Sequence, residues 1–139
     1  MTLTSLTDAK KTGLKDRKVD LILIISPCSE SHYGDAKKLG DSLNVPVIAL
    51  NSPYSYKYDI GGGGPFDLTY VMKRIPKGWV FRQYPSDYEC IIEGPNYEIF
   101  RAKTFKTRPR LTEIAGDAMK ASEEKYGTVG NDRIFQQRL

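Results

Sequence analysis

The chain has 139 residues, of which 40% are hydrophobic and 27% are charged, a balance that is ordinary for one globular domain. No apolar run approaches the ~20 residues that cross a bilayer, and residues 1–18 lack the apolar core of a secretory signal. Cys28 and Cys90 make neither a disulfide framework nor a metal-binding spacing, and His32 is the only histidine. The composition therefore excludes a cluster of histidine ligands within the chain and favours a reducing compartment, with a Cys28–Cys90 disulfide as the alternative if the two residues lie close. We predict no cofactor.

The first apolar segments predict a strand, a helix and a second strand. Val19–Ser26 is isoleucine-rich, which is typical of a strand buried on both faces. Ser29 or Ser31 can cap a helix that ends before Asn44, and Val45–Leu50 is the second strand. Strand, helix and strand within about thirty residues form a βαβ unit, so we expect parallel strands with a right-handed crossover.

A long loop, Asn51–Pro65, follows and holds three alternating tyrosines and a glycine quartet. The quartet Gly61–Gly64 is not a Walker loop, because no Gly-Lys-Ser or Gly-Lys-Thr follows it, and its spacing is not a dinucleotide fingerprint. We interpret it as a hinge or bulge, with anion binding by its backbone N–H groups as the alternative. The tyrosines Tyr54, Tyr56 and Tyr58 are candidates for a protein interface, for base stacking or for packing over a sheet edge.

After the glycines the hydrophobic pattern changes to a period of two, which is typical of strands. The alternating segments are Phe66–Ile75, Gly78–Pro85, Tyr88–Ile92 and Tyr97–Arg101. Residues that favour turns lie between them, as in Gly94-Pro95-Asn96. This part of the chain therefore predicts an antiparallel meander.

The last third of the chain predicts a helix followed by a tail. Pro109 suits the first turn of a helix, and apolar residues then recur at helical spacing as far as Met119. Gly127 is a suitable residue to end this helix. The polar tail of residues 128–139 includes three large apolar residues, Ile134, Phe135 and Leu139. Apolar residues in such a tail indicate docking, either onto this domain or onto a partner.

The net charge is +4, and the basic residues gather in three groups. The third group, which we call the basic stretch, has no acid within it and consists of Arg101, Lys103, Lys106, Arg108 and Arg110. Like charges this close repel one another unless a partner or their spacing relieves the repulsion. We expect an acidic protein surface to do so, and an anionic membrane surface and nucleic acid are the alternatives.

Cys28 follows the first strand and precedes the helix, so it is a candidate nucleophile with His32 as its base. A catalytic dyad needs spatial contact and a third, orienting group, and nothing in the sequence nominates one. We therefore interpret this segment as a capping loop, and we predict that the protein is not an enzyme.

Several pieces of the chain occur in a characteristic order. An apolar strand ends in Ile25–Pro27, and a second strand runs into Leu50–Pro53. The segment Gly78–Pro85 ends in Val-Phe-Arg-Gln-Tyr-Pro, and Arg108-Pro109 precedes the last helix. Across Val19–Tyr126 this order resembles the C-terminal part of a cyanobacterial and plastid domain family that includes the low-photosystem-II-accumulation assembly factors.

The resemblance implies a plastid protein on the stromal side of the thylakoid membrane that serves photosystem assembly or structure. It supplies no catalytic residues. Domains of the family usually carry a further N-terminal α/β portion, whereas only the arm of residues 1–18 precedes the first strand here. Functions that reside in that portion are therefore not implied.

We predict an α/β protein with one mixed sheet of about five strands, a βαβ unit followed by a meander, and two helices. Its parts are an arm at 1–18, a single domain at 19–126 and a docking tail at 127–139. The predicted function is a non-enzymatic auxiliary subunit or assembly factor on the stromal face of a photosystem, with photosystem I favoured over photosystem II. The alternative is a small-molecule or nucleotide-binding α/β enzyme domain that uses the Asn51–Gly64 loop. Partner contacts are expected from the three loop tyrosines, the basic stretch and the three apolar tail residues, without nucleic acid, metal or a transmembrane helix.

Overall fold

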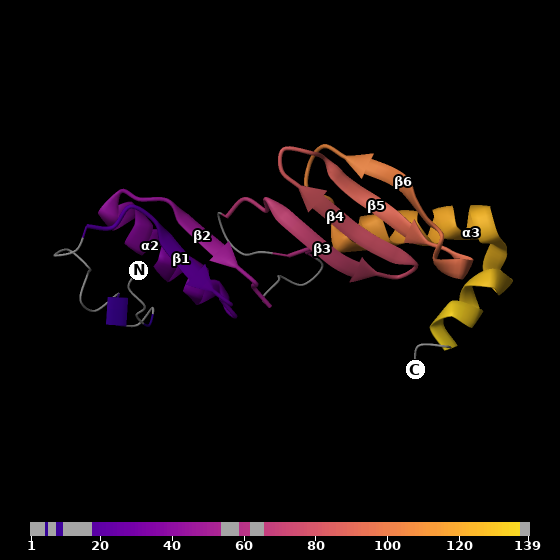
Figure 1. Cartoon of the computed structure of the whole chain (residues 1–139), viewed down its shortest axis with the longest axis horizontal. Coiled ribbons are helices and arrows are strands. Elements are labelled where there is room, and N and C mark those ends of the chain that lie inside the picture. Colours follow the sequence, from indigo (N-terminus) through magenta and orange to yellow (C-terminus); the bar gives the residue numbers. More distant parts are fainter. Residues whose placement is uncertain (1–4, 6–7, 10–17, 54–58, 62–65, 137–139) are drawn as a thin grey trace. The chain divides into compact units, whose positions relative to one another are not determined.

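The computed structural model describes residues 5, 8–9, 18–53, 59–61 and 66–136, with side chains described as far as Gly127 (Figure 1). The chain divides into two compact units. The N-terminal unit comprises residues 1–56 and 61–67, and the C-terminal unit comprises residues 57–60 and 68–139.

The N-terminal unit is the predicted βαβ unit. Strand β1 (Ile22–Ile25) is followed by helix α2 (Glu30–Leu43) and strand β2 (Val47–Leu50). The two strands are parallel, and Ile22 is paired with Val47 and Ile25 with Leu50. The parallel pairing confirms that a helical crossover joins the strands, because parallel neighbours cannot be joined by a tight hairpin.

Helix α2 begins and ends at the residues that its sequence favours. Ser29 is the N-cap, and its hydroxyl oxygen accepts a hydrogen bond from the His32 N–H at 3.4 Å. Asn44 ends the helix with a left-handed backbone, φ 53° and ψ 46°. Gly40 allows the helix to lie close to β2, because a Cβ there would come within 2.4 Å of Val47 Cγ2. A larger residue at this position would force the helix away from the strand.

One expectation for β1 is wrong. The strand was expected to be buried on both faces, but its burial alternates, and α2 covers only the face of Ile22 and Ile24. The opposite face of the two-stranded sheet exposes Leu21, Leu23, Ile25, Ile48 and Leu50, each by 44% or more. A sheet of two parallel strands with one helix has no second layer to cover that face.

The C-terminal unit is the predicted meander. Its strands are β3 (Tyr70–Ile75), β4 (Gly78–Gln83), β5 (Tyr88–Glu93) and β6 (Ile99–Phe105), and they lie antiparallel in chain order. A short 3-10 helix, η1 (Pro95–Tyr97), forms part of the β5–β6 connection. The α/β class is confirmed, but the described residues form six strands in two sheets rather than about five strands in one mixed sheet.

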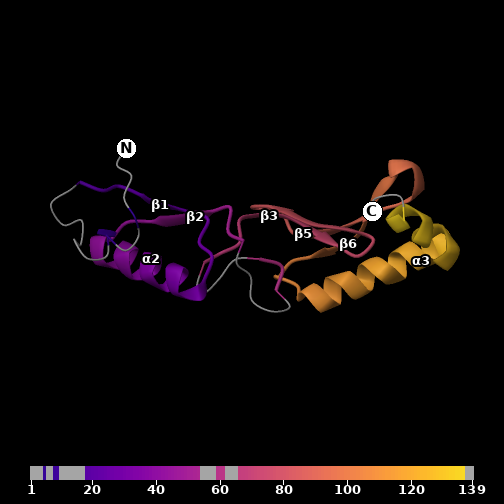
Figure 2. The ribbon, with the colours of Figure 1, turned by 90° about the horizontal axis from the view of Figure 1, so that it is seen from below.

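Helix α3 (Leu111–Gln136) lies along one face of this sheet, as Figures 1 and 2 both show. The core between them contains Val80, Cys90 and Ile92 from the strands and Ile114 and Ala118 from the helix, all fully buried. The alternation of buried and half-buried residues along β5 follows directly from the period of two in its sequence. Burial of these side chains is the main source of stability in this unit.

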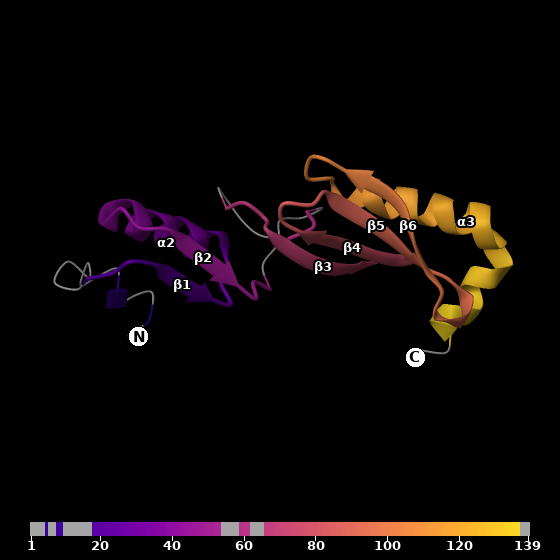
Figure 3. The ribbon, with the colours of Figure 1, turned by 45° about the horizontal axis from the view of Figure 1, so that its top comes forward.

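The predicted end of the last helix is only partly right. Gly127 leaves the helical conformation, with φ 70° and ψ 170°, as its sequence position predicts. The backbone then resumes a helix as far as Gln136, so residues 128–136 of the predicted tail are helical (Figure 3). At the other end the helix begins at Leu111, two residues later than Pro109.

Candidate functional site

The face of the four-stranded sheet that lies away from α3 is the most distinctive surface of the described chain. We call it the outer face. The strand registers give two rows that cross all four strands on this face. One row is Arg74, Trp79, Ile91 and Arg101, and the other is Met72, Phe81, Glu89 and Thr104. Tyr70, Gln83, Glu93 and Ile99 complete it.

Large apolar side chains occupy much of the outer face. Tyr70, Met72 and Ile99 are 61%, 58% and 67% exposed, and Trp79 and Phe81 are half-buried. The rings of Tyr70 and Phe81 meet edge to face, with their centroids 6.0 Å apart. Solvated faces of antiparallel sheets usually carry polar side chains, so this composition is unusual for a surface that only meets water.

Two ion pairs cross the outer face. Arg74 pairs with Glu93, and its guanidinium carbon lies 4.8 Å from the centre of the Trp79 ring. Arg101 Nη2 lies 2.7 Å from Glu89 Oε1. In both pairs the arginine side chain is more exposed than the glutamate. Arg74 is 33% exposed and Glu93 10%, and Arg101 is 60% exposed and Glu89 18%. The charge that reaches the solvent from these pairs is therefore mainly the guanidinium.

The structure corrects the interpretation of the basic stretch. Three of its five cations pair with acids that are distant in the sequence: Arg101 with Glu89, Lys103 with Asp117, and Arg108 with Asp59. The hydrogen bond that Lys103 donates to Asp117 at 2.7 Å raises the pKa of the lysine above its ordinary value. The repulsion that we assigned to an acidic partner is thus relieved mainly within the chain.

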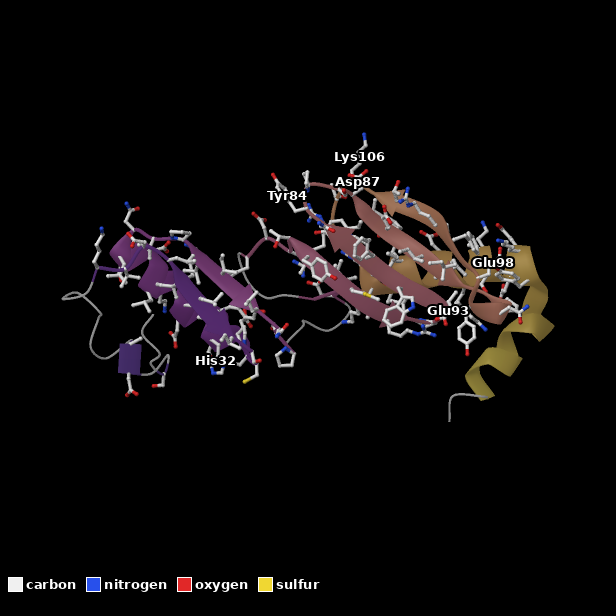
Figure 4. All side chains as sticks on the ribbon, viewed as in Figure 1. His32, Tyr84, Asp87, Glu93, Glu98 and Lys106 are labelled. Atoms are coloured by element: carbon white, nitrogen blue, oxygen red, sulfur yellow. The ribbon has the colours of Figure 1, made fainter. Side chains whose placement is uncertain are left out.

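Lys106 and Arg110 are the two cations of the stretch that have no acidic partner within the described part of the chain. Both are exposed, and Lys106 extends away from the ribbon beyond β6 (Figure 4). Because only these two keep an unpaired charge, the basic stretch is a weaker electrostatic feature than its sequence predicts.

The other predicted contact residues lie outside the residues whose side chains are described. Tyr54, Tyr56 and Tyr58 fall in the undescribed part of the loop, as do Gly62, Gly63 and Gly64. Ile134 and Phe135 belong to the helical backbone after Gly127, but their side chains are not described, and Leu139 is undescribed altogether. The predictions for these residues remain predictions.

Cys28 and His32 are in contact, as a dyad would require. His32 Nδ1 accepts a hydrogen bond from the Cys28 backbone N–H at 3.2 Å and lies 3.6 Å from the Cys28 thiol. Among the described residues no carboxylate contacts the other ring nitrogen, so no orienting group completes a catalytic set. The bond to the backbone N–H fits the interpretation of this segment as a capping loop.

The described residues contain no group of three or more side chains arranged to hold a metal ion. None of the helices in the described ranges is long and apolar enough to cross a membrane. Cys90 is fully buried beneath α3, and this desolvation raises the pKa of its thiol to about 11. The thiol is therefore a packing group rather than a nucleophile.

No family model matches this chain, and neither the curated proteins nor the solved structures include a significant match.

Sequence reasoning did not select the outer face as a candidate site, although the signal for it was present. The alternation along β4 places Trp79 and Phe81 on one side and Val80 on the other. One of these sides had to remain open unless a second layer covered it. Which side α3 covers depends on tertiary packing, and this information is absent from the alternation itself.

Proposed function

We propose that the protein is a non-enzymatic docking protein, an auxiliary subunit or assembly factor of a larger complex. The observation that carries the proposal is the outer face, where six large apolar side chains lie beside the Arg74–Glu93 and Arg101–Glu89 ion pairs. The six apolar residues are Tyr70, Met72, Trp79, Phe81, Ile91 and Ile99. Contiguous apolar surface of this kind marks an interaction site in soluble domains.

The composition of this face supports a protein partner. Protein interfaces are enriched in tryptophan, tyrosine, phenylalanine, methionine and arginine, and the outer face has each of these residue types. Trp79 lies in the middle of its row with Arg74 stacked on it, which is a rigid arrangement. Rigid aromatic anchors lose little conformational entropy on binding, and they dominate the binding energy of many interfaces.

The resemblance across Val19–Tyr126 supports a photosystem as the larger complex, at the stromal side of the thylakoid membrane in a chloroplast. Photosystem I is favoured over photosystem II in this proposal.

Co-migration tests the proposal. A tagged protein is expressed in a photosynthetic host, thylakoids are solubilised in mild detergent, and the complexes are separated on a density gradient. We expect the protein in the fractions of photosystem I, and a basic protein of equal size and charge serves as the control for non-specific adsorption. A protein that stays at the top of the gradient, away from both photosystems, contradicts the proposed function.

A further inference from the structure

We infer that the outer face binds a partner protein whose surface has an apolar centre flanked by carboxylates that meet Arg74 and Arg101. This inference rests on the proposed function and deepens it, because it assigns the docking surface and the chemistry of the partner. It replaces the basic stretch with the outer face as the principal surface for contact.

The two arginines belong to the row Arg74, Trp79, Ile91 and Arg101. These residues are direct cross-strand neighbours on β3, β4, β5 and β6. Neighbouring strands lie about 4.8 Å apart, so three intervals separate the Cα atoms of the two arginines by about 14 Å. Both side chains lean towards the middle of the sheet, because Arg74 contacts Trp79 and Glu93 and Arg101 contacts Glu89. The row therefore presents two guanidinium groups beside an apolar tryptophan and isoleucine.

The two arginines keep hydrogen-bonding capacity for a partner. A guanidinium has five N–H donors, whereas Arg74 contacts Glu93 through Nη1 and Arg101 contacts Glu89 through Nη2. The ion pairs hold both guanidinium groups in place before binding, which lowers the entropy cost of a further contact. A carboxylate of the partner can approach the exposed side of each arginine and complete a charge-assisted hydrogen bond.

Single-stranded nucleic acid fits this face less well than a protein does. Base stacking needs an open aromatic face, but Arg74 covers a face of Trp79, and the Phe81 ring meets Tyr70 edge to face.

A second copy of the chain is also disfavoured by charge. A two-fold axis parallel to the strands and through the middle of the row would place Arg74 of one copy opposite Arg101 of the other. A two-fold axis along the row would place each arginine opposite itself. Both arrangements bring like charges together at the ends of the interface, so a different protein with acids at those places is the better complement.

The first test is site-specific photo-crosslinking. p-Benzoylphenylalanine replaces Met72, which is 58% exposed on the outer face, or Met119, which is 44% exposed on α3 and serves as the matched control. Each variant is mixed with detergent-solubilised photosystem I or photosystem II particles and irradiated. We expect Met72, and not Met119, to crosslink to one photosystem subunit, at a segment that contains aspartate or glutamate. Crosslinks to RNA, to lipid or to a second copy overturn the inference.

The second test compares two charge reversals of equal size. Arg101→Glu reverses an end of the row, and Lys106→Glu reverses an unpaired cation of the basic stretch. We expect Arg101→Glu to raise the Kd for the particles about tenfold and Lys106→Glu to change it less than about twofold. Arg101→Gln removes the charge without reversing it, so it disturbs the fold less, and we expect it to raise the Kd by a smaller factor than Arg101→Glu does. Thermal melts verify that each variant is folded. Reversal of the crosslinked acid to lysine is expected to restore the binding of Arg101→Glu.

The outcomes separate this inference from the proposed function. If the wild-type protein co-migrates with a photosystem but Arg101→Glu binds as well as wild type, the outer-face assignment is wrong and the docking function stands. The same holds if Lys106→Glu weakens binding as much as Arg101→Glu does. If the wild-type protein binds neither particle, the proposed function and the inference fail together.

Discussion

Arg108 donates a hydrogen bond from Nε to Asp59 Oδ1 at 2.9 Å, and this contact joins the segment before β3 to the connection between β6 and α3. Asp59 Oδ1 also accepts the Ile60 N–H at 2.7 Å, and the Asp59 carbonyl accepts from Lys73 Nζ at 3.1 Å. Ile60 itself is buried in the core of the C-terminal unit. Asp59 therefore takes part in three hydrogen bonds that fix the position of the buried Ile60.

Replacing Asp59 with alanine is expected to destabilise the C-terminal unit by about 1–3 kcal/mol. The cause is the Arg108 guanidinium that would remain, because its Nη2 is already buried with no hydrogen-bond partner among the described residues. Urea unfolding followed by the fluorescence of Trp79 measures the effect. The matched control is Glu124→Ala, which removes an exposed ion pair with Lys120 and should cost at most about 0.5 kcal/mol. Equal losses in the two variants would refute a structural role for Asp59.

Two glycines give opposite predictions for substitution by alanine. A Cβ at Gly94 would lie 2.2 Å from the Tyr126 hydroxyl, so Gly94→Ala is expected to cost about 1–3 kcal/mol through displacement of the end of α3. Gly116 lies within α3 with no atom within 4 Å of such a Cβ, so Gly116→Ala should stabilise by about 0.5–1 kcal/mol. Thermal melts of both variants provide the measurement. If Gly94→Ala left the melting temperature unchanged, Tyr126 would not pack against this turn in solution.

Glu98 should titrate below its ordinary pKa of 4.5, because Lys125 and Tyr126 both donate hydrogen bonds to its carboxylate. A folded-state pKa below the unfolded value means that the contribution of Glu98 to stability is present above pH 4.5. That contribution is lost as the pH falls through the folded-state pKa. NMR titration of the side-chain carboxyl measures the pKa directly. Lys125→Met is expected to raise it towards 4.5, and an unchanged value would contradict the ion pair.

The two cysteines should differ strongly in reactivity towards a thiol reagent at pH 8. Cys28 is exposed, whereas Cys90 is buried beneath α3 with its pKa raised to about 11 by desolvation. We expect one thiol to react at once in the native protein and the second only after denaturation. In Cys28→Ser the fast reaction should be absent. Fast modification of two thiols in the native protein would show that α3 does not cover Cys90.

Local patterns were sufficient to predict most elements of this fold. The period-two alternation in Gly78–Pro85 and Tyr88–Ile92 predicted strands that the structure confirms as β4 and β5. Of the two predicted N-cap candidates, Ser29 caps α2, and Asn44 ends the helix as predicted. These predictions succeed because capping and alternation depend on backbone geometry within a few residues, which the sequence lists directly.

Tertiary structure alone decided which surfaces are open and which charges are paired. Three of the five cations of the basic stretch looked uncompensated because their acids are distant, as when Lys103 meets Asp117 over 14 residues and Arg108 meets Asp59 over 49. Likewise, the alternation on β4 allowed either Trp79 or Val80 to face the core until α3 covered the Val80 side. A sequence specifies the charge and the polarity of each side chain, but the partner of a charge and the exposure of a face arise only when distant segments pack together.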